Sequence, residues 1–361
     1  MSKPPFQKHP DFIIRSESPF NGGAEPHQLI ESAVTPVDLF FVRNHGDVPE
    51  VDRNTYRLTV GNTSFALDDL KTRFERVSVP ATLQCAGNRR SELVAIQPIP
   101  HELEWGTEAV SHAVWAGVRL GDVLAASGLG GEADSSHIEF IGLDETERRG
   151  ERFRFGGSIP LTKAMQNEVI LAYEMNGAPL TPVHGAPLRA VVPGYIGARS
   201  VKWLTQINML AEPSQNYFQR VAYRLFAPTV TAETVHWDEG LMLGEMNVNS
   251  VICSHADGMR VPAGPVTVAG FAIAGGGRQV ARVDVSCDGG HSWQQAQLHE
   301  AAQAWSWRLW SLTTDLAPGQ TQLLVRAVDT AANAQPQDYL QVWNFKGYMN
   351  NAWHRVAITV T

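Results

Sequence analysis

The hydrophobic and polar positions divide the chain into two regions of different texture. In the first, from about residue 40 to 210, short alternating segments mix with short stretches of helical spacing. Every second residue of 77–85 is apolar or cysteine, which predicts a strand that places these side chains on one face. Pro80 interrupts this segment, so we expect the strand at a sheet edge or at a bulge. Residues 120–124 instead have helical spacing, and Gly128 fits the end of that helix.

Past about Pro228 the helical spacing gives way to short segments that alternate between apolar and other residues. Such segments occur at 283–287, 305–309 and 323–327. Short strands at regular spacing with few helix signals predict a β-sandwich. The sequence therefore predicts an α+β protein made of an extended arm over 1–35, a mixed α+β domain over 36–235 and an all-β sandwich domain over 236–361.

Composition supports two globular domains and excludes several classes of protein. The 361 residues exceed what one ordinary core holds, and 43% of them are hydrophobic against 18% charged. This balance excludes collagen-like, disordered and small disulfide-rich chains. A net charge of −8 argues against a nucleic-acid partner. Because no apolar run reaches the ~18 residues that a membrane span needs, we expect no membrane partner either.

Cysteine usage and the first residues indicate a compartment. The chain has three cysteines, Cys85, Cys253 and Cys287. So small and odd a number does not fit a disulfide framework, which indicates a reducing environment. The motif that attaches c-type haem is absent, so we expect no haem. The polar and proline-containing N-terminal residues show no secretion signal. We therefore expect a cytoplasmic protein, or a periplasmic one if a signal has been removed.

Two stretches carry candidate chemistry. Residues 84–90 read Gln-Cys-Ala-Gly-Asn-Arg-Arg, so Cys85 ends a predicted strand and enters a turn of small residues that lets a ligand approach the backbone. The two arginines favour the thiolate, which binds soft metals or attacks electrophiles. The same spacing equally fits a buried cysteine followed by solvated arginines.

A second candidate stretch is basic and rich in glycine and proline. It contains His184, Arg189, Arg199 and Lys202, which together suit a phosphate or another anion. Surface charges at strand ends are the alternative interpretation. The segment Phe-Phe-Val-Arg-Asn-His at 40–45 is, by itself, as typical of a packed turn as of a ligand site.

In their order along the chain, these stretches resemble the sulfite oxidase family of molybdenum enzymes, and the resemblance runs from about Thr35 to Val356. The chain is similar to the haem-free plant-like or bacterial members. The resemblance implies a molybdopterin-binding domain followed by an immunoglobulin-like dimerisation domain, and therefore a homodimer. The matching segments are Phe-Val-Arg-Asn-His at 41–45, Leu-Gln-Cys-Ala-Gly-Asn-Arg-Arg at 83–90, Tyr-Glu-Met-Asn-Gly at 173–177, His-Gly-Ala-Pro-Leu-Arg at 184–189, Gly-Ala-Arg-Ser-Val-Lys-Trp-Leu at 197–204 and Asn-Ala-Trp-His-Arg-Val at 351–356.

Site residues follow from the resemblance by position. It implies that Cys85 ligates molybdenum. The residues implied to hold the molybdopterin are Phe41, Val42, Arg43, Asn44, His45, Cys85, Asp144, His184, Arg189, Ser200, Val201 and Lys202. The residues implied to form the catalytic, substrate-binding pocket are Arg43, Arg90, Trp105, Tyr223 and Lys346.

Two positions depart from the family pattern. Lys346 stands where the family has an arginine, which keeps the charge but loses the planar fork that binds an oxyanion with two hydrogen bonds. Ala222 stands where an acidic residue usually precedes the pocket tyrosine. We expect these changes to alter substrate affinity and proton handling more than the reaction class.

The resemblance implies oxidation of sulfite to sulfate by oxygen-atom transfer, with electrons passed to dioxygen or to a separate cytochrome. A nitrate reductase of the same superfamily, or an enzyme acting on another oxygen-transfer substrate such as an organic sulfoxide, is the nearest alternative. A non-catalytic binding scaffold is a third hypothesis, from a different class.

Overall fold

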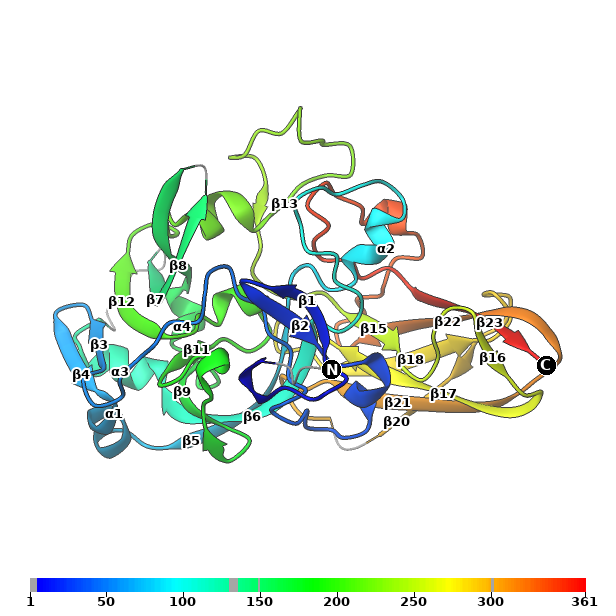
Figure 1. Cartoon of the computed structure of the whole chain (residues 1–361), viewed down its shortest axis with the longest axis horizontal. Helices are drawn as coiled ribbons and strands as arrows, with labels where there is room; N and C mark the ends of the chain where they lie inside the picture. Colours follow the sequence, from blue (N-terminus) through cyan, green and yellow to red (C-terminus); the bar gives the residue numbers. More distant parts are fainter. Residues whose placement is uncertain (1–4, 130–135, 149, 300–301) are drawn as a thin grey trace.

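The computed structural model describes residues 5–129, 136–148, 150–299 and 302–361. Figure 1 shows a mixed α+β body built from the first part of the chain beside a body of long strands built from the last part, with the N-terminal arm packed near their junction. Within the described ranges, no helix has the length and apolar character needed to cross a bilayer.

The first body contains an antiparallel sheet that carries the predicted edge strand. Its order is β10-β9-β6-β5, with β11 paired to β9. Pro80 lies in β5 at the edge of this sheet, as predicted. The strands are β5 (Val77–Gln84), β6 (Val110–Arg119), β9 (Ile170–Met175), β10 (Ala178–Pro179) and β11 (Arg189–Val191).

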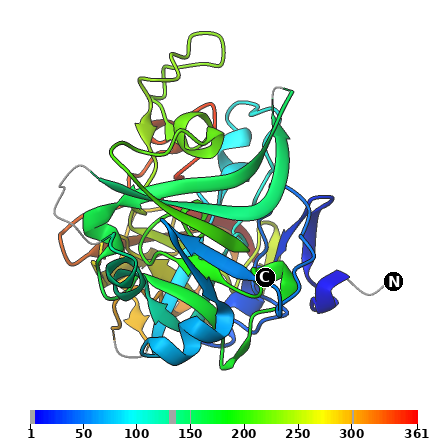
Figure 2. The same cartoon turned by 90° about the vertical axis from the view of Figure 1, so that its left-hand side faces the viewer.

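A second sheet of the first body has the order β4-β3-β12-β7-β8. Strand β12 is parallel to β3 and antiparallel to β7. Figure 2 shows the long β7–β8 hairpin sweeping across the upper part of this body. The strands are β3 (Arg57–Val60), β4 (Thr63–Ala66), β7 (His137–Arg148), β8 (Glu151–Pro160) and β12 (Leu204–Leu210).

Short helices connect these strands. The predicted helix over 120–124 is α3, and its three apolar side chains at 120, 123 and 124 are fully buried. Gly128 follows α3 with a φ of +74°, a left-handed value that glycine adopts without strain and that confirms the predicted end. The helices are α1 (Leu67–Arg73), α2 (Arg90–Val94), α3 (Leu120–Ala126) and α4 (Leu161–Ala164).

The last part of the chain forms the predicted β-sandwich. A four-stranded sheet, β15-β17-β21-β20, faces a five-stranded sheet, β16-β23-β22-β18-β19, and buried valine, leucine and isoleucine side chains with Trp310 fill the space between them. The strands are β15 (Asn249–Ile252), β16 (Met259–Val261), β17 (Gly264–Ile273), β18 (Val280–Ser286), β19 (Gln294–Gln295), β20 (Gln297–Leu298), β21 (Arg308–Leu316), β22 (Gly319–Asp329) and β23 (His354–Val360).

The strand predicted over 305–309 is wrong at its start, because β21 begins only at Arg308. Trp305 and Trp307 instead bind the edge strand β5 of the first body. The backbone N–H of Thr82 donates to the carbonyl of Trp305 at 2.9 Å, and the N–H of Trp307 donates to Oγ1 of Thr82 at 2.9 Å. This tryptophan segment therefore joins the sandwich to the first sheet. It also buries Thr82, which lies on the face of β5 that an alternating pattern predicts to be exposed.

The connection between the two bodies stays on the first body for some distance. Strand β13 (Arg224–Leu225) pairs with β14 (Leu241–Met242), and Met246 is buried in the core of the first body before β15 begins. The domain boundary predicted at 235/236 lies in the loop between β13 and β14.

The N-terminal arm is packed rather than free. Strands β1 (Ile13–Glu17) and β2 (Phe20–Gly23) form an antiparallel hairpin. Gly22 of β2 exchanges backbone hydrogen bonds with Val42, at 3.1 and 2.8 Å. The arm thereby holds the Phe-Val-Arg-Asn-His segment at 41–45 in place through backbone pairing.

Candidate active site

The loop after β5 holds Cys85 in a buried position at the end of the strand. Only 6% of Cys85 is exposed, and its backbone N–H donates to the carbonyl of Ala109 at 2.9 Å. The N–H of Gly87 points to Sγ of Cys85 at 3.4 Å. A Cβ at Gly87 would lie 2.3 Å from the guanidinium of Arg90, so a larger residue there would require the Arg90 side chain to move. The loop thus presents the sulfur together with a backbone donor.

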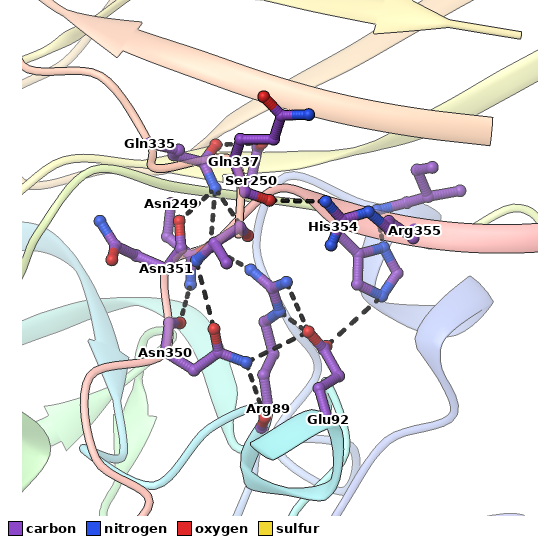
Figure 3. A network of polar contacts seen from close by, with 12 residues as sticks. Arg89, Glu92, Asn249, Ser250, Gln335, Gln337, Asn350, Asn351, His354 and Arg355 are labelled. Carbon is purple, nitrogen blue, oxygen red and sulfur yellow. Dashed lines mark hydrogen bonds and ion pairs between the residues drawn. The ribbon is translucent and has the colours of Figure 1, made fainter. Parts of the chain in front are cut away.

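A buried polar network fastens this loop to the sandwich (Figure 3). Arg89 is fully buried, donates two hydrogen bonds to Glu92 at 2.8 and 2.7 Å, and donates a third to Asn249 at 2.7 Å. Burial alone would raise the pKa of Glu92, but Arg89 brings it below its ordinary value. Asn350 donates to the carbonyl of Arg89 at 2.9 Å. The cysteine loop is therefore held by residues far away in the sequence.

The segment before β23 contacts the same loop. The N–H of Met349 donates to the carbonyl of Ala86, next to the cysteine, at 2.7 Å. His354 accepts a hydrogen bond from the N–H of Ile252 at 3.1 Å, and its other ring nitrogen lies 3.8 Å from Glu92 (Figure 3). Burial lowers the pKa of His354 to about 4, so the ring is neutral. Its contacts with Ile252 and Glu92 link the sandwich to the cysteine loop.

Cys85 opens into a buried cavity, which we call the inner pocket. It brings together ten of the residues that the resemblance implied. These are Phe41, Arg43, His45, Cys85, Asp144, His184, Arg189, Ser200, Lys202 and Tyr223.

The other implied residues lie elsewhere. Val42 packs in a small apolar cluster with the arm, because neighbouring side chains of an extended segment point to opposite sides. Val201 is part of the main core. Arg90 and Trp105 are buried but do not line the inner pocket, and the indole N–H of Trp105 has no hydrogen-bond partner. The remaining two, Asn44 and Lys346, line the outer cleft described below.

The inner pocket carries uncompensated positive charge. Among the described residues that line it, Arg43, Arg189 and Lys202 are basic and only Asp144 is acidic, so basic groups exceed acidic ones by two. Burial, and then Arg189, lower the pKa of Lys202 well below its ordinary value. Burial also lowers the pKa of Arg189 to about 9 and raises that of Asp144 to about 6. One carboxylate oxygen of Asp144 has no hydrogen-bond partner.

Lys8 of the arm is a residue of this site that sequence reasoning missed. Its ammonium group donates to the carbonyls of Val37 and Phe40 at 2.7 and 2.8 Å, and it lies 2.8 Å from Nε2 of His184. Burial, followed by Lys8, lowers the pKa of His184 well below its ordinary value, so the ring is neutral. The same Nε2 also lies 3.3 Å from the carbonyl of Val37. Lys8 lies in a polar segment without periodicity, so no sequence pattern marked it.

Tyr223 closes the inner pocket on another side. It follows the π-helical turn η5 (Phe218–Ala222), and its ring stacks on Tyr348 with centroids 5.4 Å apart. The Tyr223 hydroxyl lies 3.0 Å from Nε2 of His45. Burial raises the pKa of Tyr223, and burial and then Arg43 lower that of His45. Both groups are therefore neutral, and the hydroxyl keeps a proton to donate.

The inner pocket opens onto a wider depression, which we call the outer cleft. Arg43 and His45 line both spaces. Glu102, Lys346 and Tyr348 also line the outer cleft, and the ammonium of Lys346 is ion-paired with Glu102. A small anion in the outer cleft thus has both Lys346 and Arg43 on the walls around it.

Comparison with known proteins defines the class. The family described as "Oxidoreductase molybdopterin binding domain" matches residues 45–218, and the family described as "Mo-co oxidoreductase dimerisation domain" matches 241–361. Human mitochondrial sulfite oxidase is 45% identical over 98% of this chain, and sulfite oxidase of Arabidopsis thaliana is 39% identical over 97% of it. The sulfane dehydrogenase SoxCD of Paracoccus pantotrophus has a similar fold, with a TM-score of 0.80 at 27% identity over 96% of this chain and 88% of its own.

The fold and the site therefore define a molybdopterin-dependent oxidoreductase with a dimerisation domain. The chain belongs to the sulfite oxidase family. It spans about two thirds of the length of the mammalian relatives that it matches (67% of the human protein) and 94% of the plant protein.

The inner pocket fits the cofactor of this family. A phosphate dianion would balance its two excess positive charges, which burial otherwise makes costly. The unpartnered Asp144 oxygen is an acceptor for a ring N–H, and the Cys85 sulfur is a soft ligand for a transition metal. Residues that hold the phosphate would be Arg189 and Lys202.

Proposed function

We propose that this protein oxidises sulfite to sulfate with a molybdopterin cofactor whose molybdenum is ligated by Cys85. One observation carries the proposal: Cys85, Arg43 and Tyr223 line the same buried pocket, so a soft metal ligand, a cation for an oxyanion and a neutral hydroxyl donor converge there. When bound, the cofactor supplies the two-electron redox chemistry and the transfer of an oxygen atom to the sulfur of the substrate.

The chain's own residues bind and orient the reactants. Lys202 and Arg189 would hold the phosphate of the cofactor, and the neutral imidazole of His184 lines the same wall of the pocket. Asp144 accepts a hydrogen bond from the pterin. Together they fix the cofactor so that its metal lies at Cys85.

Substrate recognition falls to the opposite wall. Arg43 lies where the outer cleft meets the inner pocket, and its charge attracts a dianion into a partly buried site where solvent screens it weakly. The Tyr223 hydroxyl donates a hydrogen bond to the bound oxyanion and, because it stays protonated, takes no proton from it. Arg90 is buried, and its charge counteracts part of the rise in the pKa of Tyr223 that burial causes.

Further assignments belong to the same proposal. Electrons leave to dioxygen or to a separate cytochrome, without a haem in this chain. The protein works in the cytoplasm, or in the periplasm if a signal precedes it, and two copies pair through the sandwich. The match of residues 241–361 to a dimerisation domain supports the pairing.

The test is sulfite-dependent reduction of ferricyanide by protein from a host that makes molybdopterin. Oxidation of one sulfite with one water yields sulfate, two protons and two electrons, so two ferricyanide ions are reduced per sulfite. We expect turnover in the parent, none in Cys85→Ser and parental turnover in Cys287→Ser, a control in the sandwich. A parent with full molybdenum content that turns over nitrate or an organic sulfoxide but not sulfite would refute the proposal.

A further inference from the structure

A carboxylate bridges two cations at the entrance to the inner pocket. Glu102 lies in the segment between α2 and β6 and lines the outer cleft. One of its oxygens pairs with the ammonium of Lys346, and the other lies 3.7 Å from the guanidinium of Arg90. We call these three residues the entrance cluster. An anion that binds to Lys346 from the cleft meets a position already taken by a carboxylate.

The arginine of the entrance cluster does not depend on Glu102 for its position. Arg90 donates to the carbonyl of Leu103 at 2.5 Å and to the carbonyl of Lys346 at 3.1 Å. Its guanidinium also lies over the ring of Tyr348, 5.1 Å from the centroid. If Glu102 moves or loses its charge, Arg90 keeps these contacts and its position.

Glu102 can exchange with a solute because it is reached from solvent. Its side chain is 16% exposed and that of Lys346 is 17% exposed, whereas that of Arg90 is only 3% exposed. Its charge also acts inside the pocket, because after burial it contributes to the raised pKa of Tyr348 and of Tyr223. The carboxylate therefore opposes negative charge both at the entrance and beside the pocket tyrosine.

We propose that Glu102 is an internal competitor of the substrate anion: it occupies Lys346 in the resting protein, yields this ammonium to an entering oxyanion dianion while staying near Arg90, and recovers it as the product dianion leaves. The inference rests on the proposed function for the identity of that dianion. Glu102 would thus determine anion affinity through the cations that it contacts. The ammonium of Lys346, which is ion-paired with Glu102 in the resting protein, becomes available when the carboxylate is displaced. The carboxylate weakens binding of substrate and product alike, so it raises KM and shortens the time that the product stays bound.

The experiment measures sulfate binding to the loaded protein by calorimetry, together with steady-state sulfite kinetics. Glu102→Gln removes the charge and keeps the shape, whereas Glu102→Asp keeps the charge. Glu104→Gln is the matched control, because it changes the net charge by the same amount at a residue that is exposed and does not line the outer cleft. Thermal unfolding of each variant checks that it folds.

We expect Glu102→Gln to bind sulfate about three- to tenfold more tightly than the parent, because the variant lacks a carboxylate charge that repels the dianion at the partly exposed wall of the cleft. KM for sulfite should fall by a similar factor while kcat does not rise. Glu102→Asp and Glu104→Gln should bind sulfate within twofold of the parent. Unchanged or weaker sulfate binding in a folded Glu102→Gln overturns the competitor role, and weaker binding shows instead that Glu102 positions the cations for the anion. Because calorimetry does not depend on turnover, a parent that fails to oxidise sulfite refutes the proposed function and leaves this test intact.

Discussion

Replacement of Lys202 by methionine should weaken cofactor retention while leaving the empty protein intact. Lys202 lines the inner pocket, donates to the carbonyl of Val183 at 3.1 Å, contacts Asn44 and lies over the ring of Trp203. Methionine keeps the length and the apolar stem and removes only the charged donor. The variant therefore isolates what the ammonium contributes to binding an anion.

The expected magnitude follows from the charge of the inner pocket. With Lys202 gone, the lining retains one net positive charge instead of two, and a bound phosphate loses one charge-assisted hydrogen bond. Such a bond contributes about 1.5–3 kcal/mol, which corresponds to a dissociation constant for the cofactor that is roughly tenfold to 150-fold higher.

The effect on the cofactor-free protein should have the opposite sign. The pKa of Lys202 in the folded protein lies below its ordinary value of 10.5, mainly because of burial, so the unfolded chain binds more protons between these two values. The stability of the empty parent therefore rises with pH in that range. At pH 7, empty Lys202→Met should unfold at the same temperature as the parent or at a higher one, and the difference should shrink as the pH approaches 10.

The assay is the molybdenum and pterin content that remains after extended dialysis, with thermal unfolding of loaded and empty protein. Lys71→Met serves as the control, because Lys71 is exposed on α1 and lies outside the inner pocket. A folded Lys202→Met that keeps its cofactor as the parent does would refute the assignment of the phosphate to this wall.

Two further outcomes are expected. Arg89→Met leaves the carboxylate of Glu92 without its buried guanidinium partner and should lower the free energy of unfolding by about 3–5 kcal/mol in chemical denaturation; the double variant Arg89→Met/Glu92→Leu should recover part of it, and a loss below about 1 kcal/mol in the single variant contradicts the role of the network. In cofactor-free protein, burial lowers the folded pKa of Lys8 to about 7 against 10.5 in the unfolded chain, so the unfolded chain binds more protons and parental stability should rise between pH 7 and pH 10 by roughly 3–4 kcal/mol. Lys8→Met should flatten this rise, as judged from urea midpoints across that range, and equal slopes in both proteins would count against it.

Local sequence patterns predicted much of the fold, because the spacing of apolar residues within a segment largely determines whether that segment forms a strand or a helix. Alternation located β5, helical spacing located α3, and regular short strands indicated the sandwich. The error at Trp305 has the same origin: its alternation with Trp307 is real, but the pair packs on β5 of the other body, and no local pattern shows that contact.

The candidate site was predictable where motifs carried it and not where packing alone did. The Phe-Val-Arg-Asn-His segment placed Phe41, Arg43 and His45 in the inner pocket. Lys8 meets a histidine 176 positions away, and Glu102 pairs with a lysine 244 positions away. Neither has a neighbour in sequence that indicates its partner, because these contacts arise only when the arm and the segment before β6 fold onto the pocket.

The contact between Met349 and the cysteine loop has a consequence for how the protein matures. The loop that carries Cys85 is translated well before Met349 and Asn350, whose backbone N–H and side-chain amide hold it. A growing chain therefore cannot fasten this loop until both residues have been synthesised. Until then the cysteine loop lacks two of the contacts that fix it in the folded protein.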